Sequence, residues 1–395
     1  MQNNSFQTKK DISKKIFWII LISLVLIRIT MVLFLMQDIP HTGVELGGWR
    51  FYPDGDEGTY FNFAKPMSQF RLVEGRQMPM GFPLFLAPFI YFTKAETIED
   101  VLKPIVIVHA FLLFSLSIVL IGLMAKRVFR SKIIGSICAG IFTFHPYIFY
   151  LFFRHLGPYY PEAELFRGEV GFLGLNWLYI SSDPLSAFLV YLCFFLFFIG
   201  LVKNNPKYSL LMLVGILSGF SVMVRISNIL IVGIFILGWL LRKRIKEAVL
   251  IGGFSFFTIL PQLIYNYIFF GSPLKTGYQV YLSHYPNVFS MFSLARWPII
   301  FEKANFYIPG FIFLLPFFII LLILGTRYLL KKDKIIGLII VFWFFAYFLF
   351  YGSWIEAGIQ PRFFIPAVPP LIFITVAAFL WIFSKIKKSN FLFKQ

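Results

Sequence analysis

Residues 16–36 read IFWIILISLVLIRITMVLFLM, an apolar run in which Arg28 is the one charged residue. A helix needs about 20 mostly apolar residues to cross the hydrocarbon core of a bilayer. Four lysines between positions 9 and 15 precede the run, and no A-x-A cleavage site follows it. We therefore expect an uncleaved first membrane span over 16–37 rather than a signal peptide.

The rest of the chain has the same character. It has 395 residues, of which 59% are hydrophobic and 14% charged, and its mean hydropathy is +0.79. Because soluble domains carry about 25% charged residues, the composition excludes a soluble protein, a disordered tail and a fibre. It predicts an all-α polytopic membrane protein of about ten transmembrane helices. The expected spans are 16–37, 104–125, 133–152, 184–202, 208–224, 226–241, 247–269, 306–326, 335–353 and 364–384.

Segment 81–92 is apolar but contains Pro83 and Pro88 and is too short to cross. We expect an interfacial or re-entrant helix there. The fifth and sixth spans are short and are joined by Arg225, which predicts a hairpin that turns just inside the outer interface. Cys138 and Cys193 both lie in apolar stretches, so we expect packed thiols and no disulfide.

The net charge of +18 does not indicate a nucleic-acid partner, because the basic residues gather in short runs between the spans. With the N-terminus inside, 22 of the 36 basic residues fall in cytoplasmic segments, as membrane topology favours. The expectation is a multi-pass protein of the plasma or inner membrane with both termini cytoplasmic. We expect one membrane domain over 1–395, without a soluble C-terminal domain. The external segments are then 38–103, 153–183, 270–305 and 354–363.

The motif Asp54-Gly55-Asp56-Glu57-Gly58-Thr59-Tyr60 opens a predicted surface helix in the longest external segment. Three neighbouring acids repel one another, and partial desolvation raises the pKa of a carboxylate. Such a group suits a general base acting on a hydroxyl. The alternatives are a solvated acidic turn or a divalent-cation site, for which Asp-x-Asp is also suitable.

Two arginines end spans on the predicted outer side. Arg225 and Arg362 are candidates to bind a phosphate, because a guanidinium at a membrane interface needs a partner. The alternative for each is snorkelling to the headgroups. His155 and His284 lie in external segments and could contact a sugar, although their scattered positions, without ligand spacing, favour a packed or solvated histidine. The sequence lacks a Walker A loop, GxSxG, HExxH and a strand-following GxGxxG.

A series of short motifs follows in order along the chain. They are Asp56-Glu57-x-x-Tyr60 with Ala64, Pro79-Met80-Gly81-Phe82-Pro83-Leu84, Ala125-Lys126-Arg127-Val128-Phe129, His145-Pro146, Ser182-Asp183-Pro184-Leu185, Gly215 to Arg225, Asn266-Tyr267-x-x-Phe270-Gly271-Ser272-Pro273 and Arg362-Phe-x-x-Pro366. In their order and spacing the chain resembles the polytopic GT-C glycosyltransferases near glycosyltransferase family 39. That group includes protein O-mannosyltransferases and the aminoarabinose transferases of lipid A.

The resemblance implies a GT-C bundle whose first external loop, 38–103, carries interfacial helices and the catalytic residues. It implies an inverting glycosyltransferase that moves a sugar from a polyprenyl-phosphate donor to a hydroxyl of a glycan, lipid or protein. Asp56 would be the base with Glu57 in support, and Asp54 and Tyr60 would contact substrate. Arg225, Arg362 and Arg76 would hold the donor phosphate.

The chain departs from the family at one phosphate contact. Relatives with a lysine before the double proline use it near the donor phosphate, whereas only Arg76 could substitute here, two residues out of register. No resident cofactor is expected, with a divalent cation as the alternative. Two alternatives to this function remain. One is a transporter or flippase of a sugar or lipid-linked glycan, and the other is a polysaccharide ligase or polymerase that uses diphosphate donors. Transporters usually show inverted repeats and polar residues near the midplane, whereas here the acids gather in one external loop.

The topology is directly testable with a cysteine at position 45 in the first external segment. We expect Glu45→Cys to react with a membrane-impermeant maleimide in intact cells, because the charge distribution places 38–103 outside. The parent chain, whose Cys138 and Cys193 lie in apolar stretches, is the background control. Labelling that occurs only after lysis would reverse the whole topology.

Overall fold

The computed structural model describes residues 2–38, 44–46, 49–51, 56–73, 78–154, 181–202, 206–281, 292–295, 297–298, 311–354 and 361–392. The long helices are α1 (Gln2–Asp38), α5 (Phe114–Phe129), α6 (Lys132–Arg154), α8 (Ser182–Val202), α9 (Tyr208–Val224), α10 (Ile229–Leu241), α11 (Ile245–Phe270), α14 (Phe311–Lys332), α15 (Lys334–Ser353) and α16 (Val368–Leu392). Each of the ten predicted spans overlaps one of these helices, and the second, sixth and tenth begin in the shorter helical elements that precede α5, α10 and α16. Positions 306–310 of the eighth lie outside the described residues.

Shorter elements connect the long helices. They are α2 (Asp56–Ser68), α3 (Gly81–Thr93), α4 (Ile98–Val106), the π-helix η1 (Ile107–Leu113), the 3₁₀ helices η4 (Ile226–Asn228) and η7 (Pro361–Ala367), and α12 (Gly277–Tyr281). Two three-residue strands, β1 (Val44–Leu46) and β2 (Trp49–Phe51), pair antiparallel in the first loop. This small hairpin was not predicted in a chain that is otherwise helical.

The chain is a multi-pass membrane protein. Within the described residues six helices are long and apolar enough to cross a bilayer, namely Lys14–Leu33, Ile98–Phe129, Ser182–Val202, Ile245–Phe270, Lys334–Ser353 and Phe363–Ile386. Large apolar side chains such as Ile19, Phe257 and Leu349 are exposed on these helices, as lipid-facing surfaces require. Because α3 has only 13 residues, it is too short to cross, as predicted for segment 81–92.

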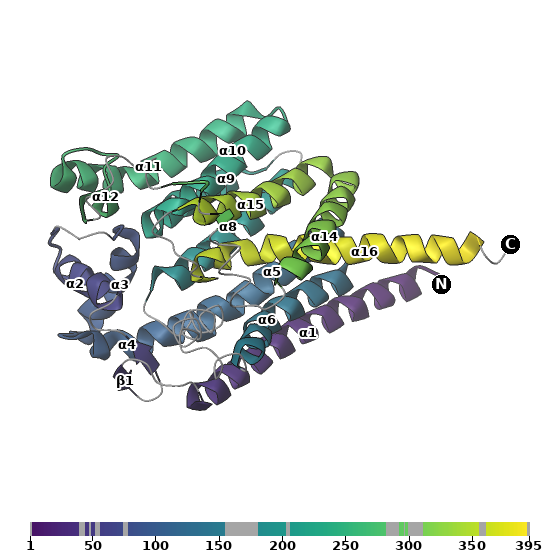
Figure 1. Ribbon diagram of the computed structural model, residues 1–395, viewed down its shortest axis with the longest axis horizontal. Helices are drawn as coiled ribbons and strands as arrows, with labels where there is room; N and C mark the ends of the chain where they lie inside the picture. Colours follow the sequence, from purple (N-terminus) through teal and green to yellow (C-terminus); the bar gives the residue numbers. More distant parts are fainter. Residues whose placement is uncertain are drawn as a thin grey trace.

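Figure 1 shows that α1 begins and α16 ends at the same end of the bundle. The first-loop elements β1, α2 and α3 lie at the opposite end, together with α12. The elements that carry the acidic motif therefore gather beyond one end of the membrane helices. This arrangement agrees with the expectation that both termini share one side of the membrane.

Helices α9 and α11 form a closely packed pair in the bundle. A side chain at Gly219 would place its Cβ 2.5 Å from the backbone oxygen of Ser255, and one at Gly215 would lie 2.9 Å from that of Ile251. The Ser255 hydroxyl donates to the Gly215 carbonyl at 3.1 Å. Small residues four apart let membrane helices approach closely enough for such contacts.

Another close contact attaches the first loop to the bundle. Gly81, at the start of α3, lies against the last turn of α9, where an added Cβ would be 2.4 Å from the Met223 carbonyl carbon. Tyr60 of α2 packs edge-on against Phe82 of α3, with ring centroids 4.7 Å apart. The interfacial helices α2 and α3 are therefore seated on the end of α9, directly before Arg225.

The second span is longer than predicted. It forms one continuous helix from Ile98 to Phe129 that includes the π-helical turn η1. The π turn begins just after Pro104, whose missing N–H interrupts the helical bonding. Arg28 of α1 is buried beside this helix, with its guanidinium 4.0 Å from the Phe114 ring centroid. A packed arginine explains the charge in the first span.

We expect Gly219→Ala to destabilise the protein by about 1–3 kcal/mol, because the new methyl group would force α9 away from the α11 backbone. The measurement is thermal unfolding of the purified protein in detergent. Gly253→Ala on α11 is the matched control, since a Cβ there meets nothing within 4 Å and alanine favours helix. Equal melting temperatures for the two variants would contradict the packing argument.

Candidate functional site

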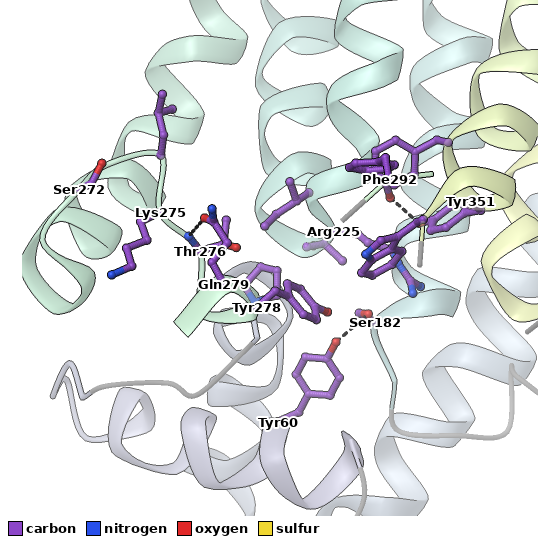
Figure 2. Close-up of a pocket in the computed structure, with 17 residues that line it drawn as sticks. Tyr60, Ser182, Arg225, Ser272, Lys275, Thr276, Tyr278, Gln279, Phe292 and Tyr351 are labelled. Carbon is purple, nitrogen blue, oxygen red and sulfur yellow. Dashed lines mark hydrogen bonds between the residues drawn. The ribbon is translucent and has the colours of Figure 1, made fainter. Parts of the chain in front are cut away.

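A pocket of about 600 Å³ lies at the end of the bundle that carries α2, α3 and α12 (Figure 2). Its walls come from α2, Pro79 before α3, the start of α8, the junction of α9 and η4, the segment from Ser272 to Gln279, Phe292 and the end of α15. Most of its lining surface is apolar or aromatic, and polar side chains such as Arg225, Lys275 and Gln279 also line it. This is the usual character of a small-molecule site.

Arg225 enters this pocket because α9 stops just before it. The residue has extended backbone angles, φ −152° and ψ 119°, between α9 and η4. Its N–H donates to the Ser221 carbonyl at 2.9 Å, and its carbonyl accepts from the Asn228 N–H at 2.9 Å. At this junction between the fifth and sixth predicted spans the helix is interrupted, and the backbone N–H and carbonyl of Arg225 are nevertheless both hydrogen-bonded, as burial in a membrane requires.

Asn228 fixes the position of this break. Its side-chain nitrogen donates to the hydroxyls of Ser186 at 2.8 Å and Ser221 at 2.7 Å, and its side-chain oxygen accepts from the Tyr347 hydroxyl at 2.7 Å. These partners belong to α8, α9 and α15. One fully buried amide thus connects three helices directly beneath Arg225.

Arg225 forms an ion pair with Asp183 in the first turn of α8. The Asp183 side chain is 4% exposed and the Arg225 side chain 15%. The guanidinium also lies over the rings of Phe363, at 4.5 Å, and Tyr351, at 5.8 Å. A charge in this apolar setting is stable when it is paired, so Asp183 accounts for the arginine without any snorkelling.

Helix α2 brings the acidic motif to the pocket. Asp56 and Glu57 occupy its first turn, where the helix dipole stabilises negative charge. One turn later the Tyr60 hydroxyl lines the pocket and donates to the Ser182 hydroxyl at 2.8 Å. Burial raises the pKa of the Tyr60 phenol, and the neighbouring Tyr278 and Asp56 raise it further. Tyr60 is therefore a hydrogen-bond donor at physiological pH.

The outer wall is held by a chain of amide hydrogen bonds from α11. The Met80 N–H donates to the Gln262 side chain at 2.8 Å, Gln262 donates to Asn266 at 2.8 Å, and Asn266 donates to the Pro273 carbonyl at 3.0 Å. Gly271 ends α11 in the left-handed region, at φ 76°. The first loop and the pocket segment are thus both tied to α11.

The predicted site residues have different outcomes. Tyr60 and Arg225 line one pocket, and Asp56 and Glu57 occupy the turn of α2 that precedes Tyr60. Arg362 belongs to η7, and its neighbour Phe363 contacts the Arg225 guanidinium; the position of the Arg362 side chain stays a prediction. The remaining predicted residues, Asp54, Arg76, His155 and His284, lie outside the described residues.

Sequence reasoning assigned no role to three groups in or beside the pocket: Asp183, which it quoted only within a motif, Asn228 and Tyr278. The position of a carboxylate or an amide at the end of an apolar run could have identified Asp183 and Asn228 as candidates, because polar groups in membrane spans need partners. Tyr278 lies in an external segment where no periodicity marks it. In the part of the chain that the structure describes, no three His, Cys, Asp or Glu side chains gather as a metal site would need.

No protein-family model matches the chain, and no curated protein is significantly similar to it in sequence. Solved structures do match it. ArnT from Cupriavidus metallidurans, bound to undecaprenyl phosphate, superposes with a TM-score of 0.52 and 15% identity over 91% of this chain and 59% of that one.

The oligosaccharyltransferase of Archaeoglobus fulgidus, tethered to an acceptor peptide, gives a TM-score of 0.55 at 12% identity, covering 91% of this chain and 49% of that one. Its apo form gives 0.55 and 12%, with 95% and 51% covered. The fold is of the GT-C type. The GT-C resemblance inferred from the motifs is confirmed at the level of the fold, and the chain spans about half to three fifths of the structures that it matches.

The ion pair in the pocket can be measured with a double-mutant cycle. We expect Asp183→Asn and Arg225→Gln to couple by about 1–3 kcal/mol in thermal unfolding, because each single change leaves the partner charge in an apolar pocket. The matched control is the Arg242–Asp333 pair, at 3.5 Å and about one third exposed, which should couple by less than about 1 kcal/mol. Equal coupling in both pairs would refute a buried, unscreened interaction.

Proposed function

We propose that the protein is an inverting membrane glycosyltransferase that moves a sugar from a polyprenyl-phosphate donor to an acceptor hydroxyl on the outer face of the membrane. The observation that carries the proposal is the pocket, where Arg225 faces an apolar and aromatic cavity next to the acidic turn of α2. The GT-C fold supports it, since ArnT was solved with undecaprenyl phosphate in place.

The chemistry of Arg225 suits a phosphate even though Asp183 is already bound. A guanidinium carries five N–H donors in a planar fork, so one edge can remain on the carboxylate while other donors face a phosphate oxygen. Arg225 therefore keeps its fixed position and still binds the donor. Arg362 and Arg76 remain proposed additional phosphate contacts.

In the proposed reaction the acceptor oxygen attacks the anomeric carbon while its proton passes to Asp56. The bond between the anomeric carbon and the phosphate oxygen breaks, and its electron pair leaves with the polyprenyl phosphate from the opposite face, so the configuration inverts. Glu57 orients Asp56 or the acceptor. The proposal includes no resident cofactor, and the acceptor is a glycan, a lipid or a protein.

The function is tested with the purified full chain in liposomes, supplied with membrane extract and a panel of radiolabelled undecaprenyl-phosphate sugars. We expect label to move from the lipid fraction to a glycan, lipid or protein fraction with release of undecaprenyl phosphate. Absence of both transfer and undecaprenyl phosphate binding across the panel would refute the proposed function.

The base assignment predicts that Asp56→Asn lowers turnover by about 10²–10⁴-fold, because an amide cannot accept the proton. The change is nearly isosteric and lies at a helix start, so the fold and donor binding should stay within about twofold. Glu57→Gln should cost less, and Asp54→Asn least. Near-normal turnover of Asp56→Asn would remove the assignment, whereas a dead Asp54→Asn would move the base by two residues.

A further inference from the structure

Tyr278 lines the same pocket as Arg225. It belongs to the short helix α12 and lines the pocket together with Tyr60 and Ser182. Figure 2 shows the rings of Tyr278 and Tyr60 pointing toward one another beside Ser182, on the side that faces Arg225. After burial, the neighbouring Tyr278 is the largest cause of the raised pKa of the Tyr60 phenol, ahead of Asp56.

The structure holds this ring in place. It forms a T-shaped pair with the ring of Trp354 at the end of α15, with centroids 5.7 Å apart and planes at 90°. The backbone before it is fixed by the Thr276 N–H, which donates to the Gln279 side chain at 2.9 Å. The amide chain that ends at Pro273 anchors the same segment to α11. A phenol held this firmly is positioned in advance for a ligand.

We propose that the Tyr278 hydroxyl donates a hydrogen bond to a phosphate oxygen of the polyprenyl-phosphate donor, across the pocket from Arg225. This inference rests on the proposed function. Tyr278 is then a catalytic residue, because the phosphate gains one negative charge as the anomeric bond breaks and a fixed donor stabilises that charge. The phosphate lies between a guanidinium on one wall and a phenol on the other.

The test compares Tyr278→Phe with the wild type for binding of undecaprenyl phosphate and for sugar transfer. The variant keeps the ring and its contact with Trp354 and removes only the hydroxyl. Loss of one hydrogen bond to a charged group corresponds to roughly a 10- to 100-fold loss. We expect undecaprenyl phosphate binding to weaken by that factor and kcat to fall more than KM rises.

Tyr267→Phe is the matched control, because Tyr267 lies on α11 with 63% of its surface exposed and outside the pocket. It should bind and turn over like the wild type, and all variants should melt at similar temperatures. If the wild type binds undecaprenyl phosphate and Tyr278→Phe binds it equally well, the inference fails while the proposed function stands. A defect in transfer alone would assign Tyr278 to the sugar and overturn its phosphate contact.

Discussion

The geometry of the pocket depends on the hydrogen bonding of one amide, that of Asn228. Inside a membrane an unsatisfied amide is costly, so its partners must be in place for the helices to assemble. Ser186, Ser221 and Tyr347 supply those partners from three helices. Meeting this single requirement fixes where α9 ends, and the end of α9 determines where the Arg225 guanidinium enters the pocket.

The pocket also needs the first loop to be seated on the bundle with little freedom. Gly81 permits backbone contact between α3 and the end of α9, and the Met80 N–H reaches Gln262 of α11. Tyr60 then reaches Ser182, the neighbour of Asp183. The acids of α2 and the guanidinium of Arg225 are therefore placed relative to one another through contacts made by other residues.

The sequence was sufficient to predict the helices, because each apolar run must satisfy its backbone bonds within itself. It was also sufficient to identify the acidic turn and Arg225 as candidate site residues, since both are local patterns. It could not predict that Asp183 pairs with Arg225 or that Tyr278 faces Tyr60, because such contacts depend on how distant helices pack. The strand pair Val44–Leu46 and Trp49–Phe51 was missed because three-residue strands carry too few residues for an alternating pattern.

The charges of the candidate site suit the movement of one negative charge that the proposed reaction requires. In the proposed reaction Asp56 loses its charge when it accepts the proton, and the leaving phosphate gains one. The charge therefore moves from the start of α2, where the helix dipole stabilises it, to the pocket wall that carries Arg225. Because Asp183 already pairs with Arg225, a donor phosphate bound as proposed would meet preorganised donors rather than an unpaired cation, and these donors would act most strongly as its charge grows.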